Sequence, residues 1–153
     1  MRTPDERSPE LRDAGVVSET RTHLPPLEHV RVGDCMHAGV LTCSADASLR
    51  DVASIMADHH VHAVVIAGGD LARPEGVISD LDVLAALATR AECTAGQAGA
   101  TEPLTVSADL NLQAAAQLMS EHGVSHLVIV DAAGGYPVGV LSSLDIAAVY
   151  AGG

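Results

Sequence analysis

Apolar residues near the middle of the chain follow a helical period. Between positions 49 and 56 they recur at i, i+3, i+4 and i+7, the spacing that places them on one face of an α-helix. They are Leu49, Val52, Ala53 and Met56. Asp46 precedes them and can cap the helix, because a carboxylate accepts hydrogen bonds from the first free amides. The pattern therefore predicts a helix with one buried stripe.

Short β-branched runs flank this helix and predict strands. One strand is expected at 40–42, before the helix, and two more are expected at 61–67 and 76–79, after it. A second helix is expected to start near Asp80. The predicted order of elements is β-α-β-β-α.

The whole pattern returns 63 residues later. The segment GVISDLD at 76–82 becomes GVLSSLD at 139–145, and TCSAD at 42–46 becomes TVSAD at 105–109. Two separate blocks that keep one offset indicate a duplicated structural unit. A half of about 60 residues would bury too little surface to be stable alone. Two β-α-β-β-α units are therefore expected to pack by pseudo-twofold symmetry, in an α/β (α+β) fold.

The repeat divides the chain into four predicted segments. Residues 1–28 lie outside it and carry scattered prolines and charges, which predicts a flexible N-terminal arm. The first repeat is expected at 29–90 and the second at 104–153. Residues 91–103 are small and polar, and we expect a linker there together with the start of the second repeat.

The composition excludes several classes of partner. Eight basic and 20 acidic residues give a net charge of −12, which repels nucleic acid and anionic membranes. All eight basic residues are arginine, so no lysine is available for catalysis or phosphate binding. No apolar run approaches the roughly 18 residues of a membrane span, and the polar N-terminus does not resemble a signal peptide. We expect a cytoplasmic protein.

The repeated motif Gly-hydrophobic-hydrophobic-Ser-x-x-Asp resembles that of the cystathionine-β-synthase (CBS) domain. The opening VGDCM at 32–36 and the strand VSHLVIVD at 124–131 are also similar to family patterns. The resemblance covers about residues 30–150 and implies a tandem CBS pair, known as a Bateman module, in a stand-alone bacterial protein. It also implies a regulatory or sensor function.

In that family, adenine nucleotides or S-adenosylmethionine bind in two clefts between the paired repeats. By resemblance, Asp82 and Asp145 hold the ribose hydroxyls, since a carboxylate can accept from two hydroxyls at once. Ser79, Ser142 and His62 are the predicted phosphate or hydroxyl contacts. Other candidates for the base or sugar pocket are Thr42, Ala63, Val64, Thr105, His126 and Leu127.

Each Ser-x-x-Asp also has a purely structural interpretation. The serine and the aspartate can cap the first turn of the helix that follows. If the first-turn amides are instead free, they favour an anionic phosphate. Ser125 stands in the second repeat where His62 stands in the first, so we expect two related sites of unequal affinity.

No catalytic arrangement is evident. The chain shows no assignable Ser-His-Asp order, no lysine and no phosphate-binding P-loop, so we expect neither an enzyme nor a catalytic cofactor. His59, His60 and their neighbours suggest zinc chemistry. Because no pair of ligands recurs at a fixed spacing, we do not expect a metal site.

The sequence favours a regulatory module that binds AMP, ADP, ATP or S-adenosylmethionine and acts on an unidentified protein client. An alternative is a ligand-free scaffold, in which apolar helix positions pair two molecules into a homodimer. The candidate positions are Leu81, Leu84, Leu144 and Ile146. A metal or redox sensor is a third, less favoured hypothesis. Its cysteines would be Cys35, Cys43 and Cys93, an odd number without a C-x-x-C pair.

Overall fold

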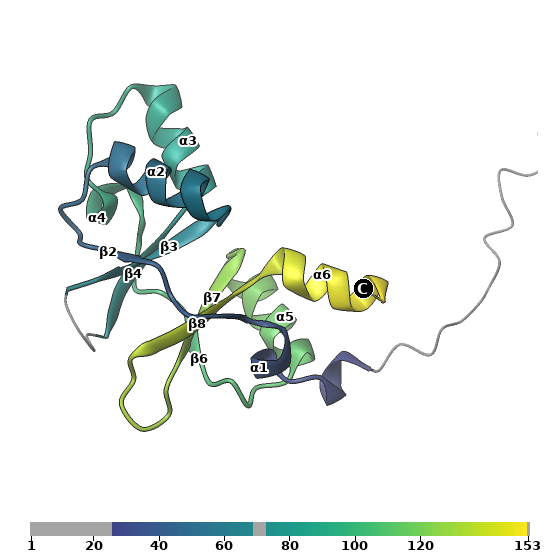
Figure 1. Ribbon diagram of the computed structural model, residues 1–153. Helices are drawn as coiled ribbons and strands as arrows, with labels where there is room; N and C mark the ends of the chain where they lie inside the picture. The colour runs from purple at the N-terminus through teal and green to yellow at the C-terminus, as the bar shows by residue number, and fades with distance from the viewer. Residues whose placement is uncertain (1–25, 69–72, 153) are drawn as a thin grey trace, which may run out of the picture.

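Two four-stranded sheets lie at the centre of the molecule. The structure is a computed structural model and describes residues 26–68 and 73–152. The first sheet contains, in spatial order, β2 (Thr42–Cys43), β3 (Ala63–Ala67), β4 (Pro74–Ser79) and β5 (Ala100–Thr101). The second contains β1 (His37–Ala38), β8 (Pro137–Ser142), β7 (His126–Val130) and β6 (Thr105–Val106). Helices lie beside both sheets (Figure 1).

The helices show that the predicted element order is correct in both copies. They are the 3₁₀ helix η1 (Leu27–His29), α1 (Val32–Cys35), α2 (Leu49–His59), α3 (Asp80–Thr89), α4 (Ala95–Ala98), α5 (Leu112–His122) and α6 (Ser143–Ala151). The first repeat is therefore β2-α2-β3-β4-α3, and the second is β6-α5-β7-β8-α6. Strand and helix boundaries differ from the predicted ones by a few residues at most.

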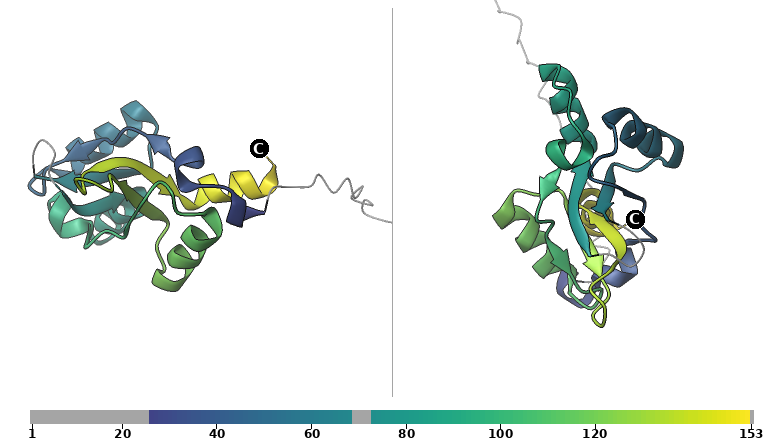
Figure 2. Two further views of the ribbon diagram at one scale, coloured as in Figure 1. Left: turned by 90° about the horizontal axis from the view of Figure 1, so that it is seen from below. Right: turned by 90° about the vertical axis from the view of Figure 1, so that its left-hand side faces the viewer.

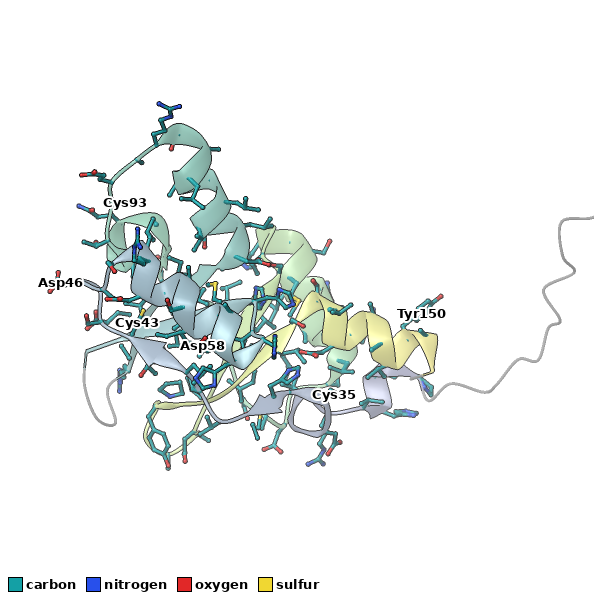
Figure 3. The ribbon with its side chains drawn as sticks, turned by 45° about the horizontal axis from the view of Figure 1, so that its top comes forward. Cys35, Cys43, Asp46, Asp58, Cys93 and Tyr150 are labelled. Carbon is teal, nitrogen blue, oxygen red and sulfur yellow. The ribbon has the colours of Figure 1, made fainter. Side chains whose placement is uncertain are left out.

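The predicted cap of α2 is wrong. Asp46 is exposed and points away from the ribbon (Figure 3). Ser48 is the N-cap instead, and its side chain accepts a hydrogen bond from the amide of Asp51 at 3.1 Å. Asn111, at the equivalent position of the second repeat, caps α5 in the same way. A hydroxyl or amide next to the first turn reaches the amides more directly than a carboxylate two residues further back.

Each sheet includes one strand from the segment that precedes the other repeat. Strand β1 pairs antiparallel with β8, and β5 pairs antiparallel with β4. Val32 anchors the first exchange, because it is fully buried in the core of the second repeat and its amide donates to the carbonyl of Leu110 at 2.8 Å. Ala95 anchors the second exchange in the core of the first repeat, where its amide donates to the carbonyl of Ala47 at 2.9 Å.

This exchange changes the interpretation of residues 91–103. The segment was expected to contain a linker, but α4 and β5 lie within it, and β5 is hydrogen-bonded to β4. Through β5 and the buried Ala95, the segment is thus part of the sheet and of the core of the first repeat.

Successive side chains of a strand point to opposite faces of its sheet, so one face packs against helices and the other packs against the second sheet. Val64 and Ile66 of β3 face the core that contains α2 and α3. Val65 between them faces the other sheet and meets Val128 of β7, and both are fully buried. These two valines occupy equivalent positions of the repeat, so the halves are related by the expected pseudo-twofold axis. Strands of both halves cross at the centre, with helices towards the outside (Figure 2).

The predicted N-terminal arm at 1–28 lies almost wholly outside the described residues. Its described end includes Leu27 in η1, which packs against the core of the second repeat beside α5. Within residues 26–68 and 73–152, none of the helices has the length and apolar character needed to cross a membrane.

Candidate functional site

A cleft of about 820 Å³ opens between the two repeats. Its first wall is the crossing segment 37–41, which leaves β1 in the second sheet and enters β2 in the first. Its second wall is 59–63, from the end of α2 to the start of β3. The second repeat contributes His126, Val140, Ser142, Leu144 and Asp145. Both repeats therefore form this site.

The Ser-x-x-Asp motifs lie where β4 and β8 end and the next helices begin. The Ser142 amide donates to Asp145 Oδ2 at 2.8 Å, and the Asp145 amide donates to Ser142 Oγ at 3.2 Å. Ser79 and Asp82 make the same capping box at 2.8 and 3.3 Å. The capping interpretation is thus confirmed for both motifs. Because these carboxylates accept the capping bonds through Oδ2, Oδ1 is the oxygen that can accept from a ligand.

The prediction that free amides at these helix starts attract phosphate is wrong for most of the first turn. At α6, the Ser143 amide donates to the Ser125 carbonyl at 2.8 Å, and the Asp145 amide is used by the cap. At α3, the Asp80 amide donates to the His62 carbonyl at 2.9 Å. Of the first-turn amides of α6, only that of Leu144 has no partner among the described residues, so an anion in this cleft would depend mainly on side-chain donors.

Two histidines of the cleft lie within ion-pair distance of an aspartate. His37 Nδ1 lies 3.4 Å from Asp145 Oδ2, with the aspartate side chain only 14% exposed. His62 Nδ1 lies 2.9 Å from Asp80 Oδ2. The hydrogen bond from His62 is the main cause that holds the pKa of Asp80 below its usual value. Both histidine side chains are exposed and can meet a ligand.

His126 lies deeper in the site. Burial lowers the pKa of its imidazole, and the nearby Asp80 carboxylate partly opposes this effect. Its Nδ1 lies 3.0 Å from Ser125 Oγ. If the serine donates this bond, Nε2–H of the neutral ring is a donor for a ligand.

Five predicted site residues line the cleft, and the others lie elsewhere. Those in the cleft are His62, Ala63, His126, Ser142 and Asp145. Ser79 and Asp82 lie at the equivalent turn of the other repeat. Thr42 and Thr105 are exposed on β2 and β6, where they pair with Val65 and Val128. The Val64 and Leu127 side chains are fully buried, so these residues could touch a ligand only through their backbone.

The cleft also contains residues that were not predicted as ligand contacts. They are His37, Ala38, Gly39, Val40, Leu41, His59, His60, Val61, Val140 and Leu144. The clustering of histidines in the sequence was a signal, but only His62 and His126 were predicted as ligand contacts, whereas His59 and His60 were considered for zinc. No local signal indicates that segment 37–41 crosses to the second sheet.

Neither metal nor redox chemistry gains support from the described residues. In residues 26–68 and 73–152, no three His, Cys, Asp or Glu side chains are grouped so as to hold a metal ion. Cys35, Cys43 and Cys93 are free and lie on different parts of the fold (Figure 3). Burial raises the pKa of both the Cys35 and the Cys43 thiol, and the Asp34 and Asp145 charges add to this at Cys35. A raised pKa lowers the thiolate fraction and the reactivity of a cysteine.

The sequence and the fold both match known proteins. The CBS domain family matches residues 32–89 and 96–152. The chain is 33% identical over 106 residues to the CBS domain-containing protein YhcV of Bacillus subtilis, which covers 65% of this chain and 72% of that protein. The CBS domain protein PAE2072 from Pyrobaculum aerophilum, solved with AMP, has a TM-score of 0.68 and 30% identity over 76% of this chain and 89% of that one.

A further structure shares the fold. The CBS domain pair of protein MJ0100, in complex with 5′-methylthioadenosine and S-adenosyl-L-methionine, superposes with a TM-score of 0.74 at 24% identity, over 80% of this chain and 97% of that chain. The strand exchange, the pseudo-twofold contact and the two sequence matches agree with one another. The chain belongs to the CBS domain family and carries two CBS domains in tandem.

Proposed function

We propose that this protein is a regulatory module that binds an adenosine-containing ligand in the cleft between its repeats. The observation that supports this most is the position of Asp145 and Ser142, which face segment 59–63 of the other repeat across one cleft. The relatives solved with AMP, or with S-adenosylmethionine and 5′-methylthioadenosine, add support. The ligand, the protein client and a cytoplasmic location are parts of this proposal.

The cleft suits a ligand with one apolar end and one polar end. Val40, Leu41, Val140 and Leu144 offer apolar surface to a base, and Asp145 Oδ1 can accept from ribose hydroxyls. A ligand held by both repeats stabilises the arrangement in which both contacts are made. It shifts the protein towards that state by its difference in affinity for the two states.

We also propose that the module catalyses no reaction itself. Ser142 and Asp145 are bound to each other in a helix cap. The serine hydroxyl therefore accepts a backbone amide and is not activated by a base. A regulatory role needs binding alone, which this geometry can supply.

Replacing Asp145 with asparagine is expected to weaken binding of AMP and S-adenosylmethionine about 10- to 100-fold. Hydrogen bonds from a ribose to a charged acceptor contribute about 1.5–3 kcal/mol, and asparagine lacks the charge. The fold should be retained, because an asparagine oxygen can still accept the capping bond from the Ser142 amide. Isothermal titration calorimetry measures the affinity.

Asp82→Asn is the matched control. It removes the same charge from the same capping box in the other repeat, but Asp82 does not line this cleft. The affinity of this cleft for AMP and S-adenosylmethionine should be unchanged in this variant. Equal losses in both variants would show that Asp145 has no special place in the site, and no binding of any adenosine ligand to the unchanged protein would refute the proposal.

A second candidate function, the dimeric scaffold, is favoured by an exposed apolar helix surface. Leu81, Leu84 and Leu87 on α3 are 60–66% exposed, and Leu144 and Tyr150 on α6 are 67% and 70% exposed. Tyr150 extends away from the ribbon (Figure 3). Ile146 was expected to join this surface, but it is only 9% exposed and packs in the core of the second repeat. We propose that α3 and α6 pair two molecules into a homodimer.

The double substitution Leu84→Glu and Leu87→Glu is expected to convert this dimer into monomers. Burying a carboxylate in an apolar contact weakens association by more than about 2 kcal/mol, or over 10-fold in Kd. Light scattering coupled to size exclusion measures the mass, with and without AMP. Gln113→Glu adds a charge on the exposed side of α5 and should leave the mass unchanged. A monomeric unchanged protein would refute the scaffold.

A further inference from the structure

Five of the eight histidines of the chain line the cleft. They come from three separate places: His37 from β1, His59, His60 and His62 from the end of α2 and the start of β3, and His126 from β7. Asp145 is the only carboxylate among the lining residues. The whole chain has a net charge of −12. The cleft differs from it, because its lining gathers five groups that can become cationic and one carboxylate.

The duplication of the chain does not explain this gathering. The residues 63 positions from His37, His60, His62 and His126 are, in the same order, Ala100, Gly123, Ser125 and Ala63. Only His59 has a histidine, His122, as its equivalent. The five histidines thus meet in one cleft, and the pseudo-twofold axis does not generate a second such group.

The backbone of His60 adds an independent observation. His60 is the C-cap of α2 with φ of 54°, a left-handed conformation, and the equivalent Gly123 caps α5 with φ of 63°. Glycine adopts this conformation without a steric penalty, whereas a residue with a Cβ does not. Backbone strain is common at functional positions, so this conformation agrees with a role for the His60 side chain in the cleft.

His37 and His62 each face a carboxylate. Asp145 faces His37 at 3.4 Å, and Asp80 faces His62 at 2.9 Å. In each pair the carboxylate accepts through Oδ2 and the imidazole takes part through Nδ1, so the Nε2 side of the ring is not used by the pair. Since both imidazole side chains are also exposed, they can donate to a ligand while they keep these partners.

The other three histidines have different surroundings. His126 lies near four titratable groups, which are Asp80, His62, Asp145 and Asp82, and burial holds its pKa down. It therefore acts as a neutral donor at pH 7. His59 follows Asp58 at the end of α2, and within residues 26–68 and 73–152 no ion pair joins His59 or His60 to a carboxylate.

We propose that these five histidines form an anion-binding wall, so that the adenosine ligand of this cleft carries a phosphate group and binds with uptake of a proton. The proposal rests on the proposed function, because Asp145 and the apolar residues hold the nucleoside. Imidazole N–H groups donate to phosphate, and an imidazolium does so more strongly. They supply the donors that a lysine would provide, which the chain lacks, and they replace the Ser143 and Asp145 amides, which already have partners.

Phosphate binding and histidine protonation favour each other, which makes the affinity for AMP depend on pH. A bound phosphate stabilises the imidazolium, so the histidine pKa is higher in the complex than in the free protein. Binding is therefore tightest below the pKa of the free histidine and weakens as pH rises through the pKa of the complex. Each histidine whose pKa rises by one unit makes AMP bind about tenfold more weakly at high pH than at low pH.

Isothermal titration calorimetry of the full chain between pH 5.5 and 8 tests this, with AMP, adenosine and S-adenosylmethionine as probes. AMP should bind more tightly than adenosine, and the difference should grow as pH falls. S-adenosylmethionine, which carries a sulfonium cation, should show no such gain. At pH 6, the heats in MES and bis-Tris, which differ in ionisation enthalpy, should show net proton uptake with AMP and none with adenosine.

The phosphate of AMP also ionises near pH 6. The variant H37Q/H60N/H62Q therefore separates the contribution of the protein to the pH dependence from that of the ligand. It should bind AMP and adenosine about equally, with the pH dependence flattened. Asparagine is chosen at position 60 because it tolerates the left-handed conformation. His122→Gln is the matched control, since it changes an exposed histidine at the end of α5, outside the cleft. It should behave as the unchanged protein.

The outcomes divide the two proposals. If AMP and adenosine bind with equal affinity at every pH, the anion wall is overturned, whereas the proposed function stands because adenosine binds. A triple variant that keeps the original pH dependence also overturns the anion wall and leaves the proposed function standing. If none of the three probes binds, both proposals fail. Should the triple variant not fold, the comparison of AMP with adenosine on the unchanged protein decides the matter.

Discussion

Leu127→Ala is expected to destabilise the protein by about 2–5 kcal/mol and to weaken both sheets together. The side chain is fully buried in the core of the second repeat, and its removal leaves a cavity that close-packed neighbours fill only in part. Since total stabilities are about 5–15 kcal/mol, this is a large fraction. The midpoint of guanidinium unfolding measures the loss.

The loss should not be confined to the second repeat. Strand β1, which precedes the first repeat, belongs to the second sheet, and β5, which precedes the second repeat, belongs to the first. Val65 and Val128 meet where the two sheets pack together. Neither sheet is complete when the other unfolds. Hydrogen exchange should therefore show protection falling equally in β3–β4 and in β7–β8. Full protection of β3–β4 beside an unprotected β7–β8 would contradict this coupling.

Leu144→Ala is the control for Leu127→Ala. It makes the same substitution at a side chain that is 67% exposed. Changes at such surface positions are usually within about 0.5 kcal/mol. A large loss of stability in this variant would mean that α6 is covered in solution, which the dimer proposed above would explain.

Gly139→Ala is expected to disturb both stability and ligand binding. A Cβ at this position of β8 would lie 2.8 Å from the His37 carbonyl oxygen and 2.7 Å from Met36 Sδ. Strand β1, which pairs with β8 through Ala38 and Gly139, would have to move away. Such overpacking costs about 1–3 kcal/mol, and we expect Tm to fall by about 3–10 °C.

The binding effect follows from the position of β1. It leads directly into segment 37–41, which forms one wall of the cleft. We expect the affinity for AMP to fall about tenfold or more, since a displaced wall forfeits its contacts (about 1.4 kcal/mol per factor of ten). Calorimetry at a temperature below both melting points measures it.

Gly68→Ala is the control for Gly139→Ala. Its added Cβ would meet the end of the Glu75 side chain, at 2.7 Å from Oε1. An exposed carboxylate can swing aside, whereas the backbone of β1 cannot. Both Tm and affinity should stay close to those of the unchanged protein. AMP affinity unaffected by Gly139→Ala would mean that segment 37–41 is not a wall of the binding site.

Local features of the fold were predictable because local physics produces them. The stripe that begins at Leu49 identifies α2, and Ser142 with Asp145 marks the start of α6, since a capping box involves only four consecutive residues. The cap of α2 was assigned wrongly to Asp46 because several residues before the stripe could serve. Only the backbone geometry shows that Ser48 does.

The site was predictable only in part. Asp145, Ser142 and His62 were identified from a repeated motif and its flanking strand, and they lie in one cleft. His37, His59 and His60 were not identified as ligand contacts. Their convergence depends on where α2 ends and on where β1 pairs, and neither is a property of neighbouring residues.

By itself, the sequence determined that the chain is a duplicated β-α-β-β-α unit, because period and offset are one-dimensional properties. Tertiary structure decided which sheet each opening segment joins. Val32 is buried in the second core and Ala95 in the first, and both placements remove an apolar side chain from water. That exchange carries segment 37–41 across the repeat interface. It thereby places the histidines of both repeats around one cleft.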